Sequence, residues 1–171
     1  VGYIEPKTQK WIYKHFIAKN IKYNEEIRIL NEFHKYIGDI MKNVNSSGKK
    51  TKPKMVHWGN AEPIHYKKAL KRMNNVNSIV DSNWIKLKWH NLYETYKNKE
   101  NIIKGCFNFG LKSIGESLYK KGKINMYWIN DDENINGITS MIYFVNGKYI
   151  DKIIKYNEID CKMLYEINKF I

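Results

Sequence analysis

At 171 residues, the chain is long enough for one domain of ordinary size, or for a small domain with an extension. With 43% apolar and 14% aromatic residues it can form a packed core, but no apolar run approaches the roughly 20 residues of a membrane-spanning helix. Two cysteines exclude a disulfide framework, and five histidines are too scattered to bind a metal ion. The composition therefore predicts a soluble chain without a membrane span, cofactor or metal.

The net charge of +13 arises from 30 lysines and arginines against 17 acidic residues. Only Arg28 and Arg72 are arginines, so 28 of the 30 basic residues are lysines (30 minus 2). Lysine lacks the planar guanidinium group that reads the edges of bases, so specific DNA recognition is disfavoured. A lysine-rich surface still attracts phosphates and favours contact with RNA, although codon bias in an AT-rich genome gives the same composition.

Residues 1–43 are predicted to form a helical hairpin that extends from the main domain. Pro6 begins the first helix, which ends near Asn20 and carries Trp11 and Phe16 on one side. Asn24 caps a second, longer helix with glutamates in its first turn. Its apolar positions recur at helical spacing, at Ile27, Leu30, Phe33, Tyr36, Ile37, Ile40 and Met41.

Residues 44–55 are predicted to form a basic linker, and residues 56–75 to contain a basic amphipathic helix. The linker combines a Ser-Ser-Gly stretch and a proline with lysines that repel one another. The helix begins near Pro63 and has apolar residues on one side and basic residues on the other. The candidate contacts with RNA or another polyanion are Lys49, Lys50, Lys52, Lys54, Lys67, Lys68, Lys71 and Arg72. A solvated loop and a solvated helix face are the alternatives.

Residues 76–171 are predicted to contain strands and helices in the order β-α-β-α-β-β-β-α. The first two strands are expected at 76–80 and 101–109, and the first two helices at 82–96 and 111–121. Three further strands are expected between Lys123 and Ile154, where runs of β-branched and aromatic residues flank Asn146-Gly147, a pair that favours a hairpin turn. A final amphipathic helix is expected to begin at Asn157.

The segment from Gly137 to Lys148 resembles the end of a thioredoxin domain, where an acidic loop, a Gly-Ile-Pro-Thr step, an apolar strand and an Asn-Gly hairpin follow one another. The resemblance implies an α/β fold with a thioredoxin-like mixed sheet and flanking helices, here preceded by a helical extension. An α+β fold with a three-stranded antiparallel meander is the alternative. Thr139 stands at the position of the family's cis-proline, and no Cys-x-x-Cys motif is present, so the resemblance implies a redox-inactive domain.

Cys106 is the candidate for residual redox chemistry. The resemblance places it near the family's redox loop, but Phe107-Asn108-Phe109 follow it, and a thiol in an apolar strand should have a raised pKa. The chain has no nucleophile-triad order, phosphate-binding loop or dinucleotide-binding motif. The acidic stretch 131–133 is expected to be a solvated turn. We therefore expect no enzymatic activity.

Together these features predict a non-catalytic structural subunit of a large assembly. An organellar ribosome in the mitochondrial matrix fits best, with contacts to rRNA and to neighbouring proteins. Two alternatives remain: a thiol-disulfide oxidoreductase that uses the single Cys106, and a protein-binding adaptor of a translocation or chaperone complex. The sequence indicates no small-molecule substrate.

Overall fold

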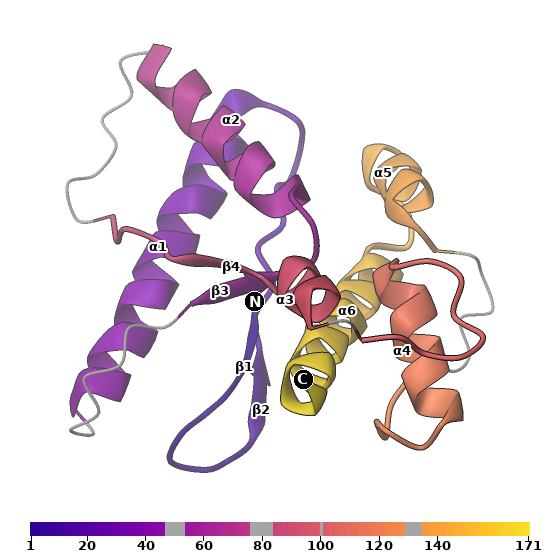
Figure 1. Ribbon diagram of the computed structural model, residues 1–171. Helices are drawn as coiled ribbons and strands as arrows, with labels where there is room; N and C mark the ends of the chain where they lie inside the picture. The colour runs from indigo at the N-terminus through magenta and orange to yellow at the C-terminus, as the bar shows by residue number, and fades with distance from the viewer. Residues whose placement is uncertain (47–53, 76–83, 100, 129–134) are drawn as a thin grey trace. The chain divides into compact units, whose positions relative to one another are not determined.

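The computed structural model describes residues 1–46, 54–75, 84–99, 101–128 and 135–171 (Figure 1). These residues form six helices and four short strands, which pair into one antiparallel and one parallel two-stranded sheet. The prediction of a fold that mixes helices and strands is confirmed in this coarse form. The thioredoxin-like sheet is not confirmed. The chain divides into two compact units, which we call unit 1 (Val1–His15 with Leu92–Ile171) and unit 2 (Phe16–Asn91).

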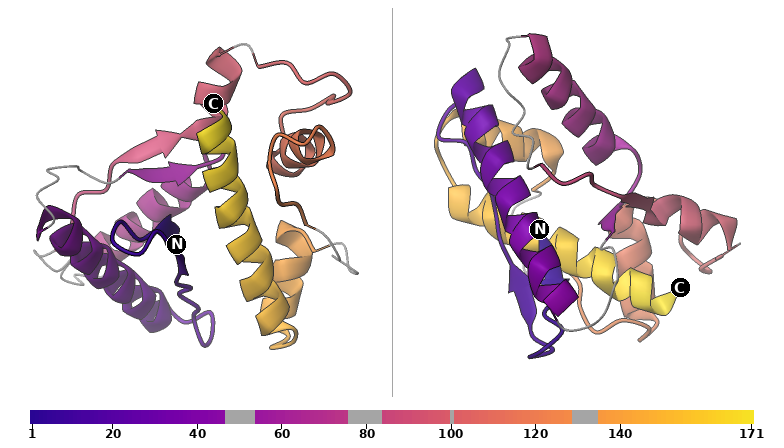
Figure 2. Two further views of the ribbon diagram at one scale, coloured as in Figure 1. Left: turned by 90° about the horizontal axis from the view of Figure 1, so that it is seen from below. Right: turned by 90° about the vertical axis from the view of Figure 1, so that its left-hand side faces the viewer.

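Unit 2 contains two long helices and the parallel strand pair. Its elements are α1 (Tyr23–Ser46), β3 (Met55–His57), α2 (Ala61–Asn75) and β4 (Trp89–Asn91). The pairing of β3 with β4 places Met55 beside Trp89 and His57 beside Asn91, and the two strands lie side by side in Figure 2. The helices predicted from Asn24 and near Pro63 are confirmed as α1 and α2.

A buried histidine joins the two helices of unit 2. His34 of α1 is only 3% exposed, its Nε2 lies 2.8 Å from the hydroxyl oxygen of Tyr66 on α2, and its ring stacks on Trp84 at 4.1 Å between centroids. Burial lowers the pKa of His34 to about 4, so the imidazole is neutral at pH 7. The buried apolar residues of the unit are Ile37, Ala69 and Met73.

Unit 1 is assembled from both ends of the chain. Its elements are β1 (Gly2–Ile4), β2 (Trp11–Tyr13), α3 (Leu92–Asn98), α4 (Leu111–Lys120), α5 (Gly137–Val145) and α6 (Ile150–Phe170). The long helix α6 contacts β1, α4 and α5. The indole Nε1 of Trp11 donates a hydrogen bond to Glu158 at 3.1 Å, and the hydroxyl of Tyr13 donates one to the carbonyl of Ile154 at 3.3 Å.

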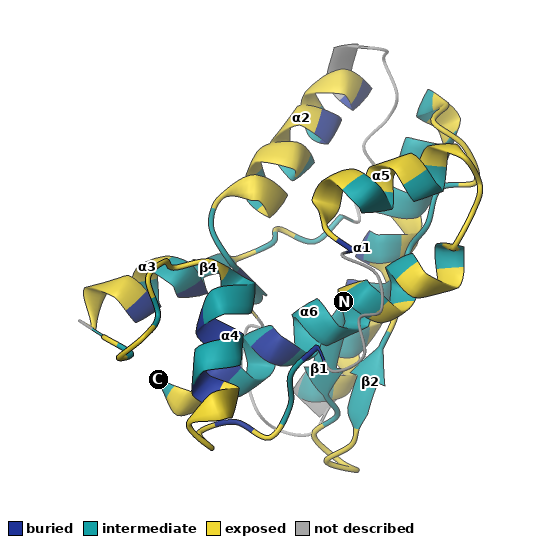
Figure 3. Ribbon diagram, turned by 90° about the vertical axis from the view of Figure 1, so that its right-hand side faces the viewer, coloured by how far each residue is buried: buried dark blue, intermediate teal, exposed yellow. Residues whose placement is uncertain are grey.

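The core of unit 1 lies where α4 meets α6. A Cβ atom added at Gly115 would lie 2.7 Å from the sulfur of Met163 and 3.0 Å from the Trp128 ring, so glycine lets the two helices approach closely. Figure 3 shows the buried positions of α4 and α6. The buried apolar side chains of the unit are Leu92, Tyr96, Ile114, Leu118, Ile124, Trp128, Ile135, Met163 and Ile167.

The helix predicted over 7–20 is wrong, because β1 and β2 form an antiparallel hairpin at the start of the chain. Trp11 and Tyr13, two residues apart, both bond to α6, which is the period of a strand rather than of a helix. The loop closes through a 2.9 Å hydrogen bond from the Glu5 amide to the Lys10 carbonyl, and Gln9 adopts a positive φ of 55°. The residues Trp11-Ile12-Tyr13, which are aromatic or β-branched, therefore form a strand, although the spacing of the apolar residues predicted a helix.

The strand and hairpin predicted over 138–154 are also wrong, because residues 137–145 form α5 and residues 150–170 form α6. The side chain of Asn136 accepts hydrogen bonds from the amides of Ile138 and Thr139, and the Thr139 hydroxyl accepts one from the Asn136 amide, which makes a capping box. Thr139 therefore stabilises a helix start, not a strand.

The Asn146-Gly147 pair ends α5 instead of turning a hairpin. Gly147 has a φ of +63°; its amide bonds to the carbonyl of Phe144 at 3.0 Å, and the Lys148 amide bonds to Tyr143 at 3.0 Å. These two bonds form a Schellman motif, which requires the same left-handed glycine as a tight hairpin. The residues that carry the thioredoxin resemblance are thus a capped helix.

Two predictions in the middle of the chain fail for the described residues. Of the helix expected over 82–96, only the end is helical, as α3, while residues 84–88 are irregular. The strand expected over 101–109 is an irregular segment with a turn at Gly105, where φ is +89°. Ile102 and Phe107 are 90% and 97% exposed, so this apolar run has no sheet to join. The helix over 111–121 is confirmed as α4.

Some predicted segments lie outside the described residues. They are most of the linker (47–53), the strand at 76–80 and the acidic turn at 131–133. Residues 123–128 are described and contain no strand, and Trp128 is buried at 6% exposure.

Candidate functional site

The α2 helix has an exposed and a buried side (Figure 3), and its predicted basic residues are exposed. Lys67, Lys68 and Lys71 are exposed, whereas Ala69 and Met73 are buried on the opposite side. The sequence therefore predicted the basic side of this helix correctly. We call these three lysines the lysine face of α2.

Arg72, the fourth predicted residue on α2, is engaged in an ion pair. Its guanidinium group bonds to both carboxylate oxygens of Glu26 on α1, with Nε at 2.9 Å from Oε2. The hydrogen bond to Glu26 raises the pKa of Arg72. Arg72 therefore joins α1 to α2, and its charge is already compensated within the protein.

The other arginine of the chain is compensated in the same way. Arg28 bonds to Glu25 at 2.8 Å and to Glu32 at 2.7 Å, both on its own helix. The bond to Arg28 lowers the pKa of Glu25 to about 2. In the described part of unit 2, the two arginines thus form ion pairs with three carboxylates, those of Glu25, Glu26 and Glu32.

The lysine face of α2 keeps its charge unpaired. Among the described residues, none of its three lysines has an ion-pair partner. By sequence, unit 2 contains 15 lysines and arginines and 6 aspartates and glutamates, a net charge of +9 out of the +13 of the whole chain. Most of the positive charge is therefore on unit 2, where phosphates can be attracted to exposed and unpaired lysines.

The predicted basic arm is described only at its end. Lys54 is exposed and immediately precedes β3. Lys49, Lys50 and Lys52 lie outside the described residues. The structure therefore brings together the predicted residues of α2 and leaves their relation to the arm as a prediction.

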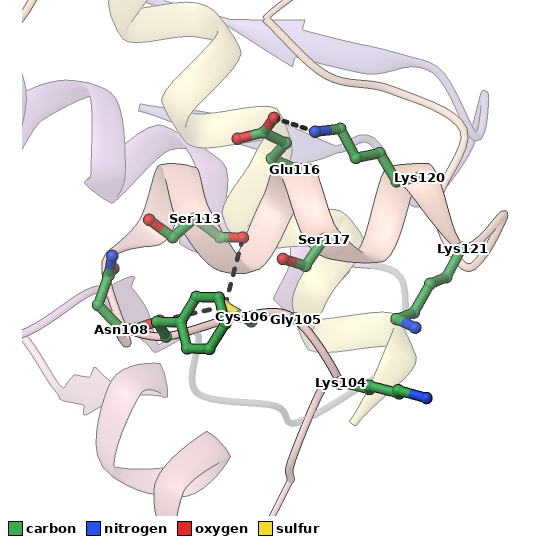
Figure 4. A pocket seen from close by; sticks show the side chains of 10 residues that line it. Lys104, Gly105, Cys106, Asn108, Ser113, Glu116, Ser117, Lys120 and Lys121 are labelled. Atoms are coloured by element: carbon green, nitrogen blue, oxygen red, sulfur yellow. Dashed lines mark hydrogen bonds and ion pairs between the residues drawn. The ribbon is translucent and has the colours of Figure 1, made fainter.

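Unit 1 contains a second candidate site, a pocket of about 460 Å³ between the loop 104–108 and α4 (Figure 4). Ser113, Glu116, Ser117 and Lys120 line it from α4, at the spacing of a single helix face. The loop contributes Lys104, Gly105, Cys106, Phe107 and Asn108, and Lys121 follows the helix. Sequence reasoning missed this site, because only the fold brings Lys104 close to the end of α4.

Cys106 lines this pocket rather than lying in an apolar strand, so the predicted setting of its thiol is wrong. The side chain is half-buried, and its sulfur donates to the carbonyls of Asn108 at 3.2 Å and Ser113 at 3.5 Å. Cys161, in α6, is in a different environment, where burial raises the pKa of its thiol.

We expect iodoacetamide to label Cys106 of the native protein well before Cys161. The thiol of Cys106 borders a pocket, whereas that of Cys161 is held in its protonated form by burial. Peptide mass spectrometry over a time course measures both rates in one sample, and urea should bring them together. Equal rates in the native protein would contradict these two environments.

The described residues contain no group of three or more His, Cys, Asp or Glu side chains placed to hold a metal ion. In the same part of the chain, no helix combines the length and the apolar character needed to cross a membrane. Comparisons of the chain with protein-family models, with curated proteins and with solved structures found no match.

Proposed function

We propose that this protein is a non-catalytic structural subunit of a ribonucleoprotein assembly, with an organellar (mitochondrial) ribosome as the best candidate. In this proposal, unit 2 contacts rRNA through the lysine face of α2 and through the arm that contains Lys49, Lys50, Lys52 and Lys54. The supporting observation is that, within the described part of the chain, both arginines are paired with carboxylates while the lysines of α2 are exposed and have no ion-pair partner. Such lysines bind phosphates without reading sequence.

Contact with neighbouring proteins is supported by α5. Its exposed side chains Ile138, Met141, Ile142 and Val145 are spaced at three, one and three residues, and they are 70%, 63%, 49% and 66% exposed. No residue of α5 is buried, although the helix contains no charge. A continuous apolar stripe of this kind is typical of a surface covered by a partner. The same stripe supports the second candidate function, a protein-binding adaptor.

The thioredoxin resemblance stays a prediction and gives this proposal no support, since its residues form a capped helix. A thiol-disulfide oxidoreductase that uses Cys106 is the remaining alternative. It would need a partner thiol, because the chain lacks a Cys-x-x-Cys motif.

The proposal predicts that Lys67→Gln, Lys68→Gln and Lys71→Gln together make RNA binding less dependent on salt. Each lost phosphate contact lowers the log-log slope by about 0.7 for single-stranded RNA, so the triple variant should lose about 2 units. Fluorescence anisotropy with a labelled single-stranded RNA, from about 50 to about 200 mM salt, measures the slope.

The matched control is the triple variant Lys97→Gln, Lys123→Gln and Lys155→Gln, which removes the same charge from exposed positions of unit 1. It should leave the slope nearly unchanged. Equal effects of the two variants would refute a specific role for α2. A partner that binds with no salt dependence, together with no measurable RNA affinity, would favour the adaptor over the ribonucleoprotein subunit.

A further inference from the structure

The pocket beside Cys106 carries uncompensated positive charge. Among the described residues, Lys104, Lys120 and Lys121 line it, and Glu116 is the one acidic residue of its lining. Glu116 bonds to Lys120 at 2.6 Å, so this pair is close to neutral. Among the described residues, Lys104 and Lys121 have no ion-pair partner, and their side chains lie at the same end of the pocket in Figure 4. The charge of the pocket therefore suits an anion.

The pocket also offers an unpartnered aromatic ring. Phe107 lines it and is 97% exposed, and among the described residues its ring makes no aromatic contact. Both a phosphate-attracting pair of lysines and a free aromatic ring are thus present within one pocket. Nucleotides combine the two complementary groups, because every base has a flat face that stacks on aromatic side chains.

The walls of the pocket are held in place before any ligand binds. The opposite face of α4 places Ile114, Gly115 and Leu118 in the core of unit 1, which fixes the helix. The loop is tied to α4 by the bond from Cys106 to the Ser113 carbonyl, and its turn is closed by the Cys106 amide on the Ile103 carbonyl at 2.9 Å. The volume of about 460 Å³ falls within the range of small-molecule sites.

We propose that this pocket binds a nucleotide, with a phosphate between Lys104 and Lys121 and the base stacked on Phe107. The nucleotide can be free in solution or one unit of a single-stranded RNA, since both present the same base and phosphate. This proposal is independent of RNA binding by α2, which belongs to the other unit.

Protection of Cys106 from iodoacetamide tests the proposal on the full chain. A ligand in the pocket covers the thiol, so AMP at about ten times its dissociation constant should slow the labelling of Cys106 about tenfold. Cys161 serves as the internal reference, and its rate should not change. The same measurement with a five-nucleotide oligoadenylate separates the two sources: protection by AMP indicates a free nucleotide, and protection by the oligonucleotide alone indicates an RNA strand.

Two variants connect protection to the proposed contacts, each compared with its own ligand-free labelling rate. Lys104→Gln with Lys121→Gln should abolish protection by AMP, while the matched pair Lys97→Gln with Lys123→Gln should retain it. Phe107→Ser should weaken protection by AMP but leave any weak protection by inorganic phosphate as it is. Failure of both AMP and the oligonucleotide to protect at millimolar concentration would overturn the proposal. Equal protection by inorganic phosphate and AMP would overturn the role of Phe107.

Discussion

Replacing Trp128 with alanine should lower the free energy of unfolding by about 3 to 5 kcal/mol. Trp128 is 6% exposed, its ring packs close to Gly115 and its indole Nε1 donates a hydrogen bond to Asp160 on α6 at 3.1 Å. Alanine would leave a large cavity between α4 and α6. Urea denaturation followed by circular dichroism measures the change.

Trp128→Phe is the matched control: it keeps an aromatic ring but loses the hydrogen bond to Asp160 and the smaller part of the indole volume, so it should cost clearly less than alanine. Met126, two residues earlier, is only partly buried, so its alanine variant should be milder. An alanine variant of Trp128 with an unchanged denaturation midpoint would show that this residue is not part of the core.

Acid should destabilise unit 2 through His34 before its carboxylates are protonated. The folded pKa of His34 is about 4, below the ordinary value of 6.5, so between these values the unfolded chain binds a proton that the folded chain excludes. Stability is unaffected above pH 7 and falls as the pH decreases from 6.5 toward 4. Between pH 7 and pH 4.5 we expect a loss of about 2 kcal/mol from this histidine.

The variant His34→Gln should lose this part of the pH dependence, whatever its stability at neutral pH. His65→Gln, on the exposed side of α2, should keep it. Urea titrations at several pH values measure the dependence, and Trp84, which stacks on His34, supplies a fluorescence signal from the same place. Identical pH profiles for wild type and His34→Gln would rule out burial of the neutral imidazole.

Helices α1, α2 and α4 could be predicted from the sequence, as could α6 from Asn157 onward, whereas α5 and the short strands could not. Helices α1, α2 and α4 repeat their apolar positions over several turns, so period and caps agree. In α5 the signals were ambiguous, because β-branched residues and Asn146-Gly147 favour a hairpin while the spacing of Ile138, Met141, Ile142 and Val145 fits a helix. The capping box between Asn136 and Thr139 decides the question in the structure, but with Thr139 in place of a glutamate or glutamine it lacks the usual sequence signature.

The candidate sites, too, could be predicted only where their residues lie close together in the sequence. The basic side of α2 follows from spacing within one helix, and it was predicted. The pairing of Arg72 with Glu26 joins residues 46 positions apart, and the pocket joins a loop to a helix end. Local patterns contain no information on such partners, so the sequence alone predicts neither the ion pair of Arg72 nor the grouping of Lys104, Phe107 and Lys121.

The hairpin at the start of unit 1 has a consequence for synthesis of the chain. It bonds to α6 across 147 residues, from Trp11 to Glu158, whereas unit 2 is one uninterrupted stretch. A two-stranded hairpin is at best marginally stable alone, so it must wait for α6, which is translated after unit 2. Unit 2 can fold as soon as it leaves the translating ribosome, since domains generally fold as units. Unit 2 therefore matures before unit 1, and the hairpin reaches its final position after unit 2 although it is made before it.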